Sequence, residues 1–245
     1  MTAPDPGSQT RKAMSPKNPV ALLLLIILVA LGLVALGGCK TAPSGSLSPI
    51  PPPDGWQEAL TDWRDRKDDQ FKNDPQTPLL AEDVPGFGGL QYWEPKPDYY
   101  YVGQINMYMQ PEQFEIVTTS GQVRPCAKVG WISFELEGQT LSLQVYRLLD
   151  QDAQSGGAAF FVPFMDATTG QETYEAGRYV DLQGPEGGPF VVDFNMAYNP
   201  WCAYGAAERY VCPVTPAENR LSVRIEVGER GHRAPPEPAA GALEG

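Results

Sequence analysis

The chain has 245 residues and a formal net charge of −12, with 18 Lys and Arg against 30 Asp and Glu. A surface this acidic argues against nucleic acid and anionic lipid headgroups as partners. The single histidine, His232, lies near the C-terminus, which excludes histidine-based nucleophiles and histidine-ligated metals from the rest of the chain. No glycine-rich phosphate loop is present, and the sequence predicts neither a cofactor nor a metal.

Residues 1–38 predict a lipoprotein signal peptide. A cationic start precedes an uncharged apolar run of 19 residues, Val20 to Gly38. The motif Leu36-Gly37-Gly38-Cys39 resembles a bacterial lipobox, in which the chain is cut before the cysteine and the thiol of Cys39 receives a lipid. An apolar run this long could also span a bilayer, so an uncleaved membrane anchor is the alternative.

The sequence therefore predicts an extracytoplasmic protein whose partner is the membrane, through lipid on Cys39. Several acyl chains would anchor it firmly to the cell membrane or the outer membrane, facing the periplasm or the exterior. Lys40, where an aspartate would favour the inner membrane, favours the outer one. Residues 39–53 are rich in Pro and Ser and predict a tether of extended, solvated backbone.

Residues 54–229 predict a single domain, and residues 230–245 predict a disordered tail. The domain begins with a helix that Asp54 caps, because Gln57 stands three residues further on in a capping-box position. Its apolar stripe consists of Trp56, Leu60, Trp63 and Phe71. Asn73-Asp74-Pro75 ends this helix, and a second, short helix is expected at Pro78 to Glu82.

The remainder of the domain alternates between apolar and polar residues with a period of two, which is typical of strands. Gly138-Gln139 lies between two of these segments and predicts a hairpin turn. The fold is thus expected to be mainly β: an antiparallel sandwich or barrel of about 7–9 strands with an N-terminal amphipathic helix. The predicted strands are Tyr99 to Met109, Val129 to Glu137, Leu141 to Leu149, Ala158 to Met165, Glu172 to Leu182, Pro189 to Tyr198 and Leu221 to Glu229.

Several long motifs carry a family resemblance. They are "FVPFMDATTGQETYEAGRY", "DFNMAYNPWCAY", "CPVTPAENRL" and the closing "VGE", together with the earlier "WRDRKDDQF", "TPLL" and "FGGLQYW". With them the chain resembles the bacterial and archaeal family called domain of unknown function 1684, from about Trp63 to Glu229. The resemblance implies one domain and no assigned reaction. Many members lack an export signal, so this chain departs from them in its N-terminus.

Five polar residues are the predicted ligand site: Arg178, Asp193, Asn195, Tyr174 and Glu226. Strand alternation places Asp193 and Asn195 on the face opposite the apolar side chains of their strand. We expect Arg178 to clamp an anionic group and Asp193 and Asn195 to orient a small polar ligand. The structural alternative is an Arg178–Asp193 pair that bridges two strands on a solvated face.

Three cysteines remain beside Cys39. Outside the cytoplasm, Cys202 and Cys212 are expected to form a disulfide. A metal site that uses both thiolates and Asp193 is the alternative. Cys126 is then unpaired and expected to be buried.

Three functions follow from these observations. The first is a lipid-anchored domain that binds a small polar ligand or an envelope component. The second is a carboxylate-dependent hydrolase with Asp193 or Glu226 as acid or base. The third is a purely structural envelope protein. Because only the second of these is an enzyme, the sequence leaves catalysis open.

Overall fold

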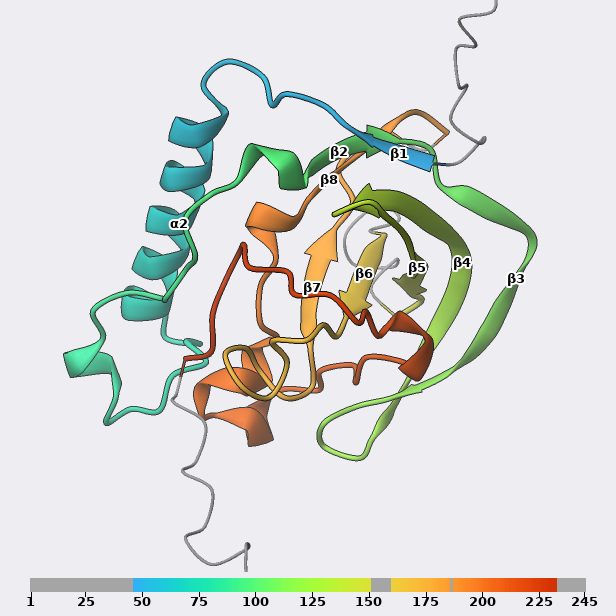
Figure 1. Cartoon of the computed structure of the whole chain (residues 1–245). Coiled ribbons are helices and arrows are strands. Elements are labelled where there is room, and N and C mark those ends of the chain that lie inside the picture. The colour runs from blue at the N-terminus through green and yellow to red at the C-terminus, as the bar shows by residue number, and fades with distance from the viewer. Residues whose placement is uncertain (1–45, 151–159, 186, 233–245) are drawn as a thin grey trace, which may run out of the picture. The chain divides into compact units, whose positions relative to one another are not determined.

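The computed structural model describes residues 46–150, 160–185 and 187–232 (Figure 1). The predicted signal peptide, Cys39 and most of the predicted tail lie outside these residues. Within them the fold is mainly β, with one N-terminal helix and an eight-stranded sheet that curls into a nearly closed barrel. No helix among the described residues is long and apolar enough to cross a membrane.

Helix α2, Trp56–Asn73, confirms the predicted amphipathic helix. Its start differs from the expectation, because Gly55 caps it with a left-handed backbone (φ 78°) and no side chain contributes a capping hydrogen bond. The capping box of Asp54 and Gln57 is therefore wrong. The helix ends as predicted, with Asp74 extended in front of Pro75. The expected helix at Pro78 to Glu82 is also wrong, and a short 3-10 helix, Val84–Gly86, follows instead.

The sheet has the order β7-β6-β5-β4-β1-β2-β8, and β3 pairs with β4 beside this path. All pairs are antiparallel except β1 with β4, so the sheet is mixed rather than purely antiparallel. Two bridges, Tyr179 with Tyr198 and Gln183 with Val191, connect the β7 end of the sheet to the β8 end and nearly close the barrel. The strands are β1 Ser46–Pro49, β2 Tyr100–Gly103, β3 Asn106–Val117, β4 Val123–Leu136, β5 Gln139–Leu148, β6 Phe161–Phe164, β7 Arg178–Asp181 and β8 Phe190–Asp193.

The predicted hairpin is confirmed between β4 and β5. Leu136 faces Gln139 in the register, so the two-residue turn is Glu137-Gly138, one residue earlier than expected. Both turn residues have positive φ, 52° and 75°, as a type I′ turn requires. That turn matches the right-handed twist of the two long strands.

The last predicted strand, Leu221 to Glu229, is wrong. Its backbone is irregular, although Leu221, Val223, Ile225 and Val227 are buried on alternate positions as expected. The period of two therefore predicts correctly which side chains are buried, although this segment forms no ladder of strand hydrogen bonds. Its polar groups bond to loops instead, for example Ala167 N to Val223 O at 2.9 Å.

Both ends of the predicted domain extend further than the composition indicates. Ser46–Pro49 pairs with β2 and β4, and Leu47 is buried, so the structure includes in the sheet a part of the predicted tether. At the other end, Arg230 donates its backbone N–H to Gln91 O at 2.7 Å. The imidazole of His232 lies 5.5 Å from the ring of Tyr204.

Aromatic rings fill the barrel. Phe194 lies 5.2 Å from the tilted ring of Phe134 and meets Phe164 edge to face at 5.5 Å. A smaller core holds helix α2 against the barrel, where Phe71 packs on Tyr204 at 4.7 Å.

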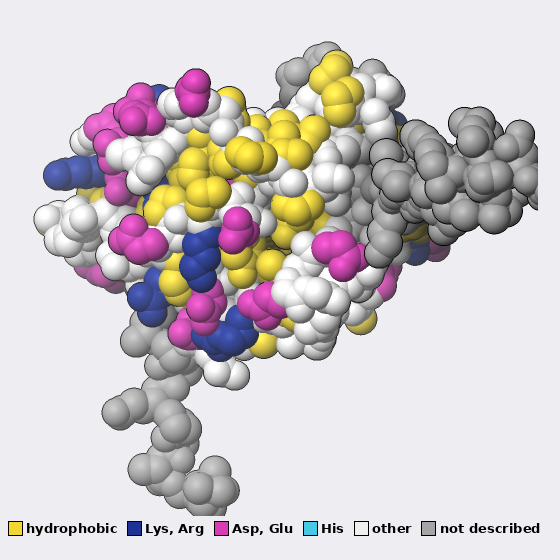
Figure 2. All heavy atoms as spheres, turned by 45° about the horizontal axis from the view of Figure 1, so that its top comes forward, with side chains coloured by type: hydrophobic (Ala, Val, Ile, Leu, Met, Phe, Trp, Pro, Cys, Tyr) yellow, Lys and Arg dark blue, Asp and Glu magenta, His cyan; other side chains and the backbone are white. Residues whose placement is uncertain are grey.

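The outer surface is not uniformly acidic. Figure 2 shows a band of hydrophobic side chains on the face brought forward from the top of Figure 1, with acidic side chains clustered beside it.

Candidate functional site

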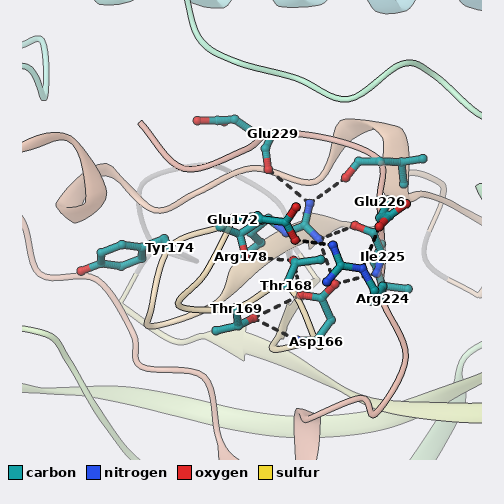
Figure 3. A network of polar contacts seen from close by, with 12 residues as sticks. Asp166, Thr168, Thr169, Glu172, Tyr174, Arg178, Arg224, Ile225, Glu226 and Glu229 are labelled. Carbon is teal, nitrogen blue, oxygen red and sulfur yellow. Dashed lines mark hydrogen bonds and ion pairs between the residues drawn. The ribbon is translucent and has the colours of Figure 1, made fainter. Parts of the chain in front are cut away.

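Arg178 lies in the interior, with 1 % of its surface exposed. Its guanidinium donates to three backbone oxygens, Val227 O at 2.6 Å, Ile225 O at 2.7 Å and Glu229 O at 3.2 Å. It also donates to the carboxylate of Asp166 at 3.4 Å (Figure 3). Burial lowers the pKa of Arg178 to about 10, against the opposing charges of Asp166 and Glu229, so the group stays charged at neutral pH.

Asp166 completes this network from the turn that follows β6. Its Oδ2 accepts the backbone N–H of Ile225 at 2.6 Å, and its Oδ1 accepts the hydroxyl of Thr168 at 2.7 Å. Asp166 and Arg178 together fasten the irregular C-terminal segment to the barrel. The structural alternative was an Arg178–Asp193 pair on a solvated face. Arg178 is indeed in an ion pair, but its partner is Asp166 and the pair is buried.

Asp193 and Asn195 are both buried, because helix α2 and the segment at Lys96 cover their side of the strand. Strand β8 ends at Asp193 and a 3-10 helix, Phe194–Met196, follows, so the predicted strand to Tyr198 extends too far. Asp193 accepts Trp56 Nε1 at 2.7 Å and the backbone N–H of Asn195 at 2.9 Å. Asn195 in turn bonds the backbone of Lys96 at 2.7 and 3.0 Å. Asp193 also borders a hollow of about 320 Å³ beside helix α2.

The remaining predicted residues lie elsewhere. Tyr174 is half-buried and points away from the Arg178 network in Figure 3. Glu226 is at the surface, where Arg224 Nε donates to it at 2.7 Å and Lys96 Nζ lies 3.8 Å away. The five predicted residues are thus distributed over several environments, and the structure does not bring them into one pocket.

Glu229, the acid of the "VGE" motif, forms a second buried network. It is fully buried and accepts Lys67 Nζ at 2.6 Å, Asn199 Nδ2 at 3.1 Å and the hydroxyl of Tyr204. Gly228 permits this position, because at φ 75° a side chain would lie 2.8 Å from Phe194 O. Lys67 thereby ties helix α2 to the C-terminal segment.

An open hollow of about 500 Å³ lies beside the end of β7 and the cysteine segment, and we call it the groove. Its lining includes two arginines, Arg124 and Arg209, and one acid, Asp181. Arg124 is already paired with Asp150 through two hydrogen bonds of 2.8 Å. The aromatic rings of the lining are Phe161, Tyr179, Tyr198, Trp201 and Tyr210.

Asp181 ends strand β7 and is solvent-exposed in the groove. The hydroxyl of Tyr198 donates to both of its carboxylate oxygens, at 3.1 and 3.2 Å. Because the concave surroundings reduce its hydration, the pKa of Asp181 is raised, although Tyr198 and Lys67 oppose the shift. Burial and the charge of Asp181 raise the pKa of Tyr198, which therefore stays a hydrogen-bond donor at neutral pH.

The cysteine segment forms one wall of the groove. Cys202 and Cys212 form the expected disulfide, with their Cα atoms 6.3 Å apart. Trp201 and Tyr210, next to this bridge, meet edge to face at 5.0 Å. No group of three His, Cys, Asp or Glu side chains gathers among the residues that the structure describes. Cys126 is free and buried as expected, and burial raises the pKa of its thiol to about 11.

Sequence reasoning missed Asp181 and Tyr198. Asp181 lay in a predicted strand without a partner that the sequence could indicate, and Tyr198 shared the apolar face of its own strand. Only the bridge between Tyr179 and Tyr198 brings the two side chains together. The richness of the Tyr198 to Pro213 stretch in aromatic residues was the available signal.

The described residues form a small mixed, nearly closed β-barrel with one N-terminal α-helix. The chain belongs to the family described as protein of unknown function (DUF1684), whose model matches residues 85–230. This range contains Asp181, Tyr198 and Trp201, whereas helix α2 precedes it.

The chain is also similar to an uncharacterized protein of Haloarcula marismortui, known from a solution NMR structure. The two are 34% identical with a TM-score of 0.54, over 71% of this chain and 94% of that chain. No curated protein matches the chain.

Proposed function

We propose that this chain is a lipid-anchored, extracytoplasmic binding protein whose groove holds a small polar ligand at Asp181 and Tyr198. The carboxylate of Asp181 carries the proposal. It is exposed in a hollow of suitable size, and no cation lies within ion-pair distance of it among the described residues. A donor group of a ligand would complete its hydrogen bonding, and the surrounding rings would cover the ligand's apolar parts.

The contacts of the sequence-predicted residues support a different role for them. Three of them are buried and hydrogen-bonded within the protein: Arg178, Asp193 and Asn195. We therefore assign them a structural role and assign the ligand contact to Asp181. A hydrolase with Asp193 and Glu226 as its pair would need both at one substrate. Asp193 is buried and Arg224 holds Glu226 at the surface, so binding is the better supported function.

The anchoring part of the proposal rests on the sequence of residues 1–40. The disulfide agrees with an oxidising compartment, as expected outside the cytoplasm. To test it, the full chain is expressed in a bacterium, and the mass of the N-terminal peptide is measured beside membrane fractionation. We expect a lipidated N-terminus at Cys39, and a Cys39→Ala chain that is not lipidated. An unlipidated wild-type chain would overturn this part.

Ligand binding is tested by a thermal-shift screen of sugars, sugar acids, amino acids and phosphorylated metabolites. The comparison uses wild type, Asp181→Asn and the control Glu115→Gln, which changes an exposed acid on β3 outside the groove. A groove ligand should raise the melting temperature of wild type and control but not that of Asp181→Asn. Equal shifts in all three proteins would remove Asp181 from the binding site.

A further inference from the structure

We infer that the groove, together with two hollows that continue it along helix α2, binds an extended, hydroxyl-rich chain, an oligosaccharide. This inference rests on the proposed function and names the class of its ligand. Three observations carry it: the continuity of the hollows, the tryptophans along them and their charge.

The groove continues into two further hollows. A neighbour of about 350 Å³ shares Asp181, Tyr198 and Trp201 with it. That neighbour shares Trp63 and Arg66 with the 320 Å³ hollow beside Asp193. Since each hollow has lining residues in common with the next, the three form one elongated depression.

One face of helix α2 forms a wall of this depression. Trp56, Ala59, Trp63, Arg66 and Gln70 line its two hollows beside the helix, and they recur at steps of three and four residues. At 1.5 Å per residue this face extends over about 21 Å. A compact metabolite would fill only a fraction of that length, whereas a chain ligand would follow it.

Three half-buried tryptophans mark the depression from end to end. Trp201 lies where the first two hollows meet, Trp63 where the second meets the third, and Trp56 in the third. The faces of sugar rings carry C–H groups with slight positive charge, which pack well on the negative face of an aromatic ring. Tryptophans separated along one groove therefore suit successive sugar units.

Charge and hydrogen bonding favour an uncharged or weakly acidic chain. The chain carries a net charge of −12, yet Arg66 and Arg209 belong to a lining whose exposed central acid is Asp181. A cationic peptide would be repelled by the two arginines, and a polyanion by the overall charge. Sugar hydroxyls can donate to Asp181 and accept from Arg66 and Gln70 at once.

Calorimetry with oligosaccharides of graded length tests the inference. The probes are N-acetylglucosamine oligomers and galacturonic acid oligomers, each from the monomer to the hexamer, and the protein is the full chain in detergent without reductant. We expect affinity to rise with length in at least one series, by about tenfold from monomer to hexamer, which corresponds to ~1.4 kcal/mol. Trp63→Ala should flatten this rise. The control Trp131→Ala changes a half-buried tryptophan of β4 outside the depression and should keep the rise.

The outcomes separate the inference from the proposed function. Equal affinity for monomer and hexamer means a compact ligand, which overturns the inference and keeps the proposed function. The same follows if neither series binds while a small ligand from the screen still depends on Asp181. If neither oligosaccharides nor small ligands bind, both fail. Should Trp63→Ala not fold, Gln70→Ala replaces it, because Gln70 is exposed and lines the middle hollow.

Discussion

Asp166 and Asp181 flank the same buried arginine along the chain but have opposite surroundings. Asp166 is buried and accepts hydrogen bonds from Arg178, Ile225 and Thr168. Asp181 is exposed and accepts them from Tyr198 alone among the described partners. A carboxylate that folding has fully saturated has no capacity left for a ligand, whereas one in an open hollow has. The comparison teaches that the availability of a polar group, rather than its residue type, distinguishes a site from a structural network.

The largest effect should come from breaking the buried network. Arg178→Met removes every donor that the guanidinium supplies to Asp166 and to the backbone oxygens around it. Because an uncompensated buried carboxylate remains, we expect the free energy of unfolding to fall by about 3–5 kcal/mol. Urea unfolding of both proteins measures it.

Arg224→Met is the matched control for that change. Arg224 pairs with Glu172 and Glu226 at the surface. Exposed ion pairs contribute little to stability because water screens them, so this variant should unfold close to wild type. Similar losses in the two variants would contradict the division into a structural network and an open surface.

The second effect concerns the wall of the groove. Replacing Cys202 and Cys212 by alanine removes the bridge, and we expect a loss of about 2–4 kcal/mol of stability. Since Trp201 and Tyr210 flank the bridge, ligand affinity should fall as well. Unfolding curves and binding are measured on the variant and on wild type, with and without reductant. An unchanged midpoint would show that the wall does not depend on the bridge.

A third, smaller effect is expected where helix α2 meets β8. Trp56→Phe keeps an aromatic ring but removes the indole N–H that donates to Asp193 at 2.7 Å. Asp193 keeps its hydrogen bonds from Asn195 in this variant. We expect a loss of stability of about 1–2 kcal/mol, as is usual for a buried acceptor that loses one donor. Denaturant unfolding measures this loss. A larger loss would mean that Asp193 depends on the helix more than its contacts indicate.

The smallest effect on stability should come from Asp181→Asn. The raised pKa means that folding favours the protonated carboxyl, so its stabilising contribution is present in acid and is lost as the pH rises through that pKa. Relative to wild type, Asp181→Asn should therefore gain stability between the usual aspartate pKa of about 3.9 and neutral pH. The difference should stay below about 0.5 kcal/mol, as for other exposed positions.

Melting temperatures of both proteins across this pH range measure the effect. A relative loss of stability for Asp181→Asn on going from acid to neutral pH would contradict the raised pKa.

Much of the fold could be predicted from local patterns. Helix α2, the β4–β5 hairpin and the buried alternation of the last segment follow from spacing and turn chemistry, which act over a few residues. The parallel pairing of β1 with β4 could not be predicted, because the composition of Ser46–Pro49 is that of a solvated spacer. The predicted grouping of five polar residues into one ligand site is wrong for a related reason. A period of two placed Asp193 and Asn195 opposite the apolar face, but it could not show that helix α2 and the segment at Lys96 cover them.

Sequence patterns alone predict a mainly β domain with one amphipathic helix, favour a Cys202–Cys212 bridge and indicate the family. These features depend on short-range spacing, on residue chemistry and on long motifs. Three contacts follow only from the three-dimensional arrangement. Arg178 donates to Asp166, Trp56 donates to Asp193, and Tyr198 donates to Asp181 in an open groove. Such pairs are set by barrel closure between segments distant in the chain, and whether a polar group ends up saturated or accessible depends on that closure.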